Sequence, residues 1–253
     1  MPAQLTVMRT AIDPKSPSPA ERERGIAAGL YRMLAWLSPG FPIGAFGFSH
    51  GLEAATETGI VHDRASLQRW IGTVVAAGMG RIDADILRAA HDAARDENIE
   101  ALETANRAGL AFRSTAETAL ETAVEGEAFL KTCRAAWPEA FLDRWAEMLA
   151  KSGRGVCYPA AVGAAMGRAG IPFECALTGY LQAMAANFVS AGLRLGIVGQ
   201  TDGQRILAAL EPVIAATVID ALERDRACFG SATFAVELAS MAHETQYSRL
   251  FRS

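Results

Sequence analysis

Residues 47–51 read Gly-Phe-Ser-His-Gly and fit the Gly-x-Ser-x-Gly pattern in which α/β-hydrolases carry a nucleophilic serine. That chemistry requires a buried strand before the serine, a helix after it, and a histidine that accepts the hydroxyl proton. Residues 41–46 contain proline and glycine and would form a poor central strand. We therefore expect no catalytic residues, and a serine hydrolase that uses Ser49 with His243 and Asp202 is kept as an alternative.

Metal-ligating side chains are few and scattered. The chain has four histidines, and none has another histidine three or four residues away. His50 shares a helical face with Glu53 and Glu57, and His243 is followed by Glu244. Imidazole and carboxylate groups could bind nickel or zinc if a second chain completed the ligand set. We expect no firm metal site; the candidates are His50, Glu53 and His243, and a stand-alone nickel carrier is a second alternative.

Two carboxylates, Asp83 and Asp85, stand two residues apart. On a helix they would point to different sides, so they do not make an acid–base pair by themselves. Arg81 and Arg88 are their expected partners on a solvated face.

The charge balance and the glycine patterns exclude two further classes of ligand. With 24 basic and 28 acidic residues, the formal net charge of −4 argues against a general nucleic-acid binder, which needs surplus positive charge. Residues 126–132 lack the glycine that precedes lysine in a P-loop, and residues 78–83 lack the third glycine of the dinucleotide-binding motif. We expect no bound nucleotide and no other firmly bound cofactor.

Helices must position these residues. Alanine, the strongest helix former, accounts for 50 of the 253 residues, and hydrophobic residues make up 51%. An apolar stripe between Leu30 and Leu37 follows the helical period, and Asp63 is expected to cap a later helix. No long stretch alternates with the period of a strand. We predict a single all-α domain of eight to ten helices over residues 26–253.

Prolines mark two interruptions of this pattern. Residues 1–25 hold four prolines and a charged run, and we expect them to form a disordered, mobile arm because they can bury little apolar surface. A helix predicted over residues 206–222 contains Pro212 and is expected to kink or break near Leu210.

The longest uncharged run, residues 175–193, raises the question of a membrane helix. It contains Gln182 and Asn187, whose amides are costly at bilayer depth, so a buried helix of an all-α core is expected. The N-terminus has no signal-peptide pattern, and no two of the four cysteines are spaced Cys-x-x-Cys. We expect a cytoplasmic protein with reduced thiols and no membrane contact.

Two segments are unusual for a bundle of helices. The loop over residues 41–48 spreads aromatic residues among glycines and a proline. The C-terminus, residues 243–253, interleaves aromatic and aliphatic residues with arginines, which are types enriched at protein interfaces. The same spacing fits a final helical turn that packs inward, and both interpretations stay open. The candidate partner-binding residues are Phe41, Pro42, Phe46, Phe48, Tyr247, Ser248, Arg249, Leu250, Phe251, Arg252 and Ser253.

These segments also carry a resemblance to a known family. Residues 37–53, Leu-Ser-Pro-Gly-Phe-Pro-Ile-Gly-Ala-Phe-Gly-Phe-Ser-His-Gly-Leu-Glu, resemble the N-terminal signature of the urease accessory protein F family, UreF. Residues 199–204 resemble its second motif, and residues 243–253 resemble its C-terminal tail. The match extends over nearly everything after the first 25 residues. In that family the serine–glycine pair belongs to a non-catalytic signature.

The resemblance implies an all-α, usually dimeric, cytoplasmic chaperone that has no catalysis of its own. It further implies a chain that bridges the accessory protein UreD, also called UreH, and the GTPase UreG, in a complex that docks on apo-urease while nickel is inserted. GTP would then be bound by UreG, and the C-terminal tail would become ordered against UreD. A passage for nickel through the complex would make His50 and Glu53 residues to test.

Overall fold

The computed structural model describes residues 19–225 and 227–252, and the regular structure within these ranges is entirely helical. The predicted all-α class is confirmed, with eleven α-helices and one short 3-10 helix in the described residues. The elements are α1 (Pro19–Trp36), η1 (Ala45–Gly47), α2 (Leu52–Glu57), α3 (Arg64–Ala77), α4 (Met79–Arg95), α5 (Ile99–Ala111), α6 (Ala116–Ala136), α7 (Ala140–Ser152), α8 (Tyr158–Arg168), α9 (Phe173–Arg194), α10 (Gln200–Glu223) and α11 (Phe234–Glu244).

Several helices begin at a polar side chain that accepts hydrogen bonds from the first turn. Asp63 caps α3, as the sequence predicts: its Oδ1 accepts from the backbone N–H of Ser66 at 2.7 Å, and the Ser66 hydroxyl completes a capping box. Thr115 caps α6 in the same way, with Thr118 as its partner. These caps satisfy N–H groups that have no acceptor within the helix, so they set where α3 and α6 start.

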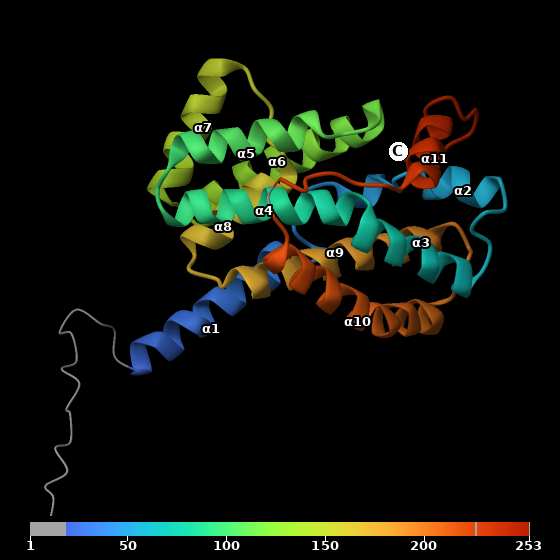
Figure 1. The fold of residues 1–253 in the computed structure, drawn as a ribbon, viewed down its shortest axis with the longest axis horizontal. Helices are drawn as coiled ribbons and strands as arrows, with labels where there is room; N and C mark the ends of the chain where they lie inside the picture. The colour runs from blue at the N-terminus through green and yellow to red at the C-terminus, as the bar shows by residue number, and fades with distance from the viewer. Residues whose placement is uncertain (1–18, 226, 253) are drawn as a thin grey trace, which may run out of the picture.

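The centre of the molecule is the close packing of α4 against α8. Glycines on α8 face the backbone of α4, because an added Cβ would lie 2.5 Å from Leu87 O at Gly163 and 2.5 Å from His91 O at Gly167. The small residues of α8 therefore serve close packing within the chain. Around this pair, α5, α6 and α7 lie on one side, and α3, α9 and α10 lie on the other (Figure 1).

Two expectations about prolines need correction. The first helix begins at Pro19, inside the segment 1–25 for which a mobile arm is expected; residues 1–18 lie outside the described residues. Proline is well tolerated in the first turn of a helix, and the alanine, glutamate and arginine residues that follow favour helix. Helix α10 runs from Gln200 to Glu223 through Pro212, so the break expected near Leu210 does not occur; Leu210 and Ile214 on either side of Pro212 are buried in the core.

The apolar stripe predicted on α1 is divided between the core and solvent. Trp36 is buried, and Met33 and Leu37 pack against the core, whereas Leu30 and Leu34 remain exposed. Helix α1, blue in Figure 1, accordingly projects from the helical body.

Helix α9 covers the uncharged run of residues 175–193 and packs as the expected buried helix, with Leu181 and Phe188 in the core. Within the described residues no helix is long and apolar enough to cross a membrane. The four cysteines are free.

Candidate functional site

The loop that carries the N-terminal signature folds back on the core through left-handed turns. Gly44 and Gly51 have φ values of 85° and 75°, and His50 between them reaches 52°, a region that non-glycine residues rarely adopt. The two ends of the loop, residues 41 and 48, are buried, and residues between them are exposed. Phe41 and Phe48 point inward and are buried, whereas Pro42 and Phe46 are exposed.

Of the predicted tail over residues 243–253, the first two residues belong to α11, and residues 246–252, called the tail from here on, lie against this loop and against α2. The backbone N–H of Arg252 donates to Gly47 O at 2.7 Å. The N–H groups of Leu250 and Phe251 donate to the two carboxylate oxygens of Glu53 at 2.7 and 3.0 Å. The two ends of the chain that the sequence singled out are therefore in direct contact, although almost 200 residues separate them.

The side chains of the tail divide into an inner and an outer set. Phe251 is buried, and its ring lies 4.2 Å from the Arg194 guanidinium, which also lies 3.6 Å from the ring of Phe46. Tyr247 is fully exposed and Leu250 is 62% exposed. Phe251 packs inward as the second interpretation expects, but not as part of a helical turn, because α11 ends at Glu244. Partner binding through the exposed tail residues stays a prediction. The polar positions Ser248, Arg249 and Arg252 are exposed, and Ser253 lies outside the described residues.

His243, at the end of α11, is buried beneath the contact between the tail and the signature segment. Its Nδ1 lies 2.9 Å from Glu117 Oε2, and its Nε2 lies 3.0 Å from Glu53 Oε2. Both ring nitrogens of His243 therefore contact carboxylates, one on α2 and one on α6. Arg249 adds a further contact from the tail to Glu117 Oε1, at 3.0 Å. Helices α2, α6 and α11 and the tail therefore share one charged cluster, formed by Glu53, Glu117, His243 and Arg249.

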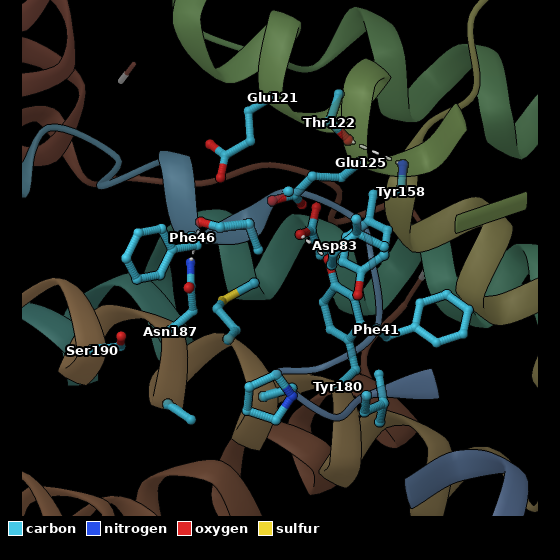
Figure 2. A pocket seen from close by; sticks show the side chains of 18 of the residues that line it. Phe41, Phe46, Asp83, Glu121, Thr122, Glu125, Tyr158, Tyr180, Asn187 and Ser190 are labelled. Carbon is cyan, nitrogen blue, oxygen red and sulfur yellow. Dashed lines mark hydrogen bonds between the residues drawn. The ribbon is translucent and has the colours of Figure 1, made fainter. Parts of the chain in front are cut away.

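A pocket of about 450 Å³ opens beside the signature loop, between that loop and helices α4, α6 and α9. Figure 2 shows aromatic rings on its walls, with Phe46 and Phe41 from the loop and Tyr180 from α9. Glu121 and Glu125 enter it from α6.

The floor of the pocket is a buried ion pair. Arg113 Nη2 lies 2.8 Å from Asp83 Oδ1, and the Tyr180 hydroxyl donates to Asp83 Oδ2 at 2.7 Å. Both side chains of the pair are only 3% exposed. The expectation that Asp83 pairs with Arg81 or Arg88 on a solvated face is wrong, because Asp83 points into the core on the other side of α4.

Two further carboxyl groups, those of Glu121 and Glu125, lie near this floor. Burial raises the pKa of Glu125, and the charges of Glu121 and Asp83 raise it further. Glu121 Oε1 lies 3.0 Å from His50 Nε2, while its other oxygen and His50 Nδ1 have no hydrogen-bond partner. The pocket therefore combines aromatic walls with buried acidic groups, of which Glu121 is incompletely paired.

The candidate metal ligands divide between these two clusters. Glu53 and His243 meet in the cluster under the tail, whereas His50 pairs with Glu121 in the pocket. Glu57 is exposed on α2. Within residues 19–225 and 227–252, no group of three or more His, Cys, Asp or Glu side chains is placed to hold a metal ion.

The serine-hydrolase triad does not assemble. Both ring nitrogens of His243 face glutamates, and Asp202 pairs with Arg64 and Arg205 at the surface. Ser49 itself is buried, and its Oγ accepts a hydrogen bond from the N–H of Glu53 at 3.4 Å, in the first turn of α2.

Sequence reasoning missed an exposed apolar stripe on α11. Phe234, Leu238 and Met241 are 76%, 64% and 46% exposed and follow a helical spacing on one face. The helical spacing of these residues can be read from the sequence, but spacing alone does not show whether the apolar face packs against the core or is exposed to solvent. The buried groups of the pocket were missed as well, because they come from helices far apart in the chain.

Comparison with known proteins decides the family. The UreF family profile matches residues 61–211. A urease accessory protein UreF from Bradyrhizobium sp. (strain ORS 278) is 47% identical over 226 residues, which cover 89% of this chain and 92% of that protein. The chain belongs to the UreF family. Another UreF, from Rhodopseudomonas palustris (strain BisB5), is 42% identical over 97% of this chain and 100% of its own length. The chain is thus a urease accessory protein.

Proposed function

We propose that this chain is a urease maturation chaperone that bridges UreD and the GTPase UreG while nickel is inserted into apo-urease. The observation that carries the proposal is one exposed apolar surface beside the tail. Phe234, Leu238 and Met241 form it on α11, and Tyr247 and Leu250 are further exposed apolar side chains in the tail that follows this helix. Apolar and aromatic side chains that a chain leaves exposed together are typical of a surface covered by a partner protein.

UreD is the partner we assign to this surface, because the family resemblance implies a C-terminal tail that becomes ordered against UreD. The UreG dimer would then meet another part of the helical body, and GTP would be held by UreG. We expect the chain to act in the cytoplasm, as a homodimer within the complex.

The experiment is co-purification with UreD after substitution within the surface. Leu238→Asp should abolish co-purification, because a carboxylate would be buried in an apolar interface without a partner. Ile219→Asp is the matched control, since Ile219 is 54% exposed on a different helix, α10. Deletion of residues 247–253 should also abolish co-purification while helical content stays intact. Undiminished capture by both variants would remove this surface from the proposal.

Co-expression with UreD and UreG, followed by sizing, tests the bridge itself. A complex that contains all three chains is expected, and it should be absent when this chain is omitted. Formation of a UreD–UreG complex without this chain would contradict the bridging role.

We propose that nickel passes through this pocket as it crosses the complex. Glu121 and His50 offer unpartnered atoms of the types that bind nickel, and the incomplete ligand set suits passage better than storage. Glu121→Gln should lower the nickel content of urease matured in its presence while UreD and UreG still co-purify. Tight one-to-one binding of nickel to the isolated chain in equilibrium dialysis would favour a stand-alone nickel carrier instead.

A further inference from the structure

We propose that the pocket beside the signature loop is a binding site for a small organic cation that combines N–H donors with an apolar body. The site is a property of the isolated chain, so it requires neither UreD nor UreG. Its occupant is a molecule other than the nickel ion of the proposed function, and the nickel route stands or falls separately. The volume of the pocket, the charges of its walls and one buried oxygen atom lead to this ligand class.

The size of the pocket and the rings in its walls suit an organic molecule. Its volume of about 450 Å³ falls within the range of about 300–1,000 Å³ in which proteins bind small molecules. Phe41 and Phe46 line it from the loop (Figure 2). Tyr158 and Tyr180 line it from α8 and α9, with their ring centroids 5.6 Å apart. Aromatic faces attract cations as well as apolar groups, and the Phe46 ring already has the Arg194 guanidinium 3.6 Å from its centroid.

The walls carry more carboxyl groups than cationic groups. Among the described residues that line the pocket, one carries a guanidinium, Arg113, and three carry carboxyl groups, namely Asp83, Glu121 and Glu125. Arg113 already pairs with Asp83, since its Nη2 lies 2.8 Å from Asp83 Oδ1. Burial raises the pKa of Glu125, and repulsion from Glu121 and Asp83 raises it further. A positive charge on a bound molecule would lessen this repulsion.

Glu121 supplies the point at which a ligand donates a hydrogen bond. Its side chain is 4% exposed and enters the pocket from α6 (Figure 2). Its Oε1 lies 3.0 Å from His50 Nε2, whereas its Oε2 has no hydrogen-bond partner among the described residues. A buried acceptor without a donor is unfavourable, so an N–H group that pairs with it stabilises the complex. Because the acceptor belongs to a carboxylate, a cationic donor binds it more strongly than a neutral one.

A metal ion on its own uses fewer of these features. Within residues 19–225 and 227–252, no group of three or more His, Cys, Asp or Glu side chains is placed to hold one. Glu121 and His50 each offer one unpartnered atom, and the faces of the aromatic rings offer no ligand atoms. An organic cation makes use of the rings, the excess of carboxyl groups and the unpartnered oxygen together.

Benzamidinium and its neutral isostere benzamide are the probes for the first test. Both join a phenyl ring to a planar group with N–H donors, but only benzamidinium is a cation at neutral pH. Isothermal titration calorimetry of the isolated full-length chain measures the two dissociation constants. We expect one-to-one binding of benzamidinium, about tenfold or more tighter than that of benzamide, because hydrogen bonds between charged groups are the stronger ones. Absence of benzamidinium binding, or equal affinity for the two probes, would overturn the inference.

Two variants of α6 locate the site. E121Q removes the charge but keeps the shape of the side chain, whereas E127Q makes the same change at an exposed position of this helix, outside the pocket. We expect E121Q to weaken benzamidinium binding about tenfold or more and E127Q to leave it unchanged. Unchanged affinity in a folded E121Q would place the bound molecule elsewhere and would also overturn the inference.

A variant that fills the pocket keeps the test decisive if E121Q does not fold. Ala183 lines the pocket from α9 and is half-buried, so Ala183→Phe adds a ring within this space. We expect this variant to lose benzamidinium binding while its circular dichroism stays that of the wild type. Undiminished binding in a folded A183F would contradict the assignment of the pocket. None of these titrations contains UreD, UreG or nickel, so a failure to co-purify with UreD would contradict the proposed function alone.

Discussion

Gly51 is the position where a single methyl group should separate α2 from α11. An added Cβ would lie 2.5 Å from the backbone N of Ser240, 2.8 Å from Ala239 C and 2.9 Å from Ser240 Cα. All three atoms belong to the backbone of α11, so no side-chain rotation can make room. Ordinary contacts between heavy atoms begin near about 3.5 Å, so α11 would have to move by roughly 1 Å.

The expected cost of Gly51→Ala has two parts. Gly51 has a φ of 75°, and a residue with a side chain costs about 1–2 kcal/mol there. Displacement of a packed helix adds about 1–3 kcal/mol, as other overpacked positions do. Gly59→Ala is the matched control, because Gly59 has a φ of 76° and an added Cβ there meets nothing within 4 Å. The difference between the two variants therefore isolates the steric part.

Urea titration followed by circular dichroism measures both free energies of unfolding. We expect Gly51→Ala to lose about 2–5 kcal/mol and Gly59→Ala about 1–2 kcal/mol. Gly51→Ala should also speed hydrogen exchange in the tail, because His243 moves with α11 away from Glu53. Equal losses for the two variants would refute the reasoning, since α11 would then have room to accept the methyl group.

Three further predictions concern the buried groups. Asp83→Asn should lower the free energy of unfolding by about 3–5 kcal/mol, because Arg113 is left buried without its charge partner. Asp202→Asn at the surface is the control and should change that free energy by less than about 1 kcal/mol. Equal urea midpoints for the two variants would contradict this prediction. Burial raises the pKa of Glu125, so the folded chain keeps a proton there that the unfolded chain releases. The contribution of Glu125 to stability therefore falls as pH rises from the ordinary glutamate pKa toward the raised one. Glu125→Gln should flatten that part of the pH dependence of the urea midpoint, and an unchanged slope would contradict the prediction. A thiol reagent should label two cysteines in the native chain and four after unfolding, since burial also raises the pKa of Cys133 to about 12; rapid native labelling of all four would disprove the burial. The pair expected to react in the native chain is Cys175 and Cys228.

Local sequence signals predicted the helices better than they predicted which residues each helix contacts. The cap at Asp63 and the buried helix over residues 175–193 both follow from a few neighbouring residues, and both are confirmed. The stripe on α11 has the same helical period as a core stripe, yet it faces solvent. Asp83 looked like a surface residue because its nearest arginines are on the same helix, whereas its partner Arg113 is 30 residues away. Contacts of that kind depend on how helices pack, which a single sequence does not state.

The Gly-Phe-Ser-His-Gly pattern shows how residues suited to catalysis can be used to hold a surface instead. Gly47 O accepts a hydrogen bond from the tail, and the Ser49 hydroxyl accepts one from the first turn of α2. His50 faces Glu121 in the pocket, and Gly51 leaves the space that α11 occupies. Each position thus contacts a different part of the chain. A reaction centre needs its polar groups to converge on one point, whereas a chaperone that presents a tail needs them to join segments that are distant in sequence. The directions of these four residues meet the second requirement, so the signature and the tail of this chain are best treated as one binding unit, in which a change at either end alters the surface offered to a partner.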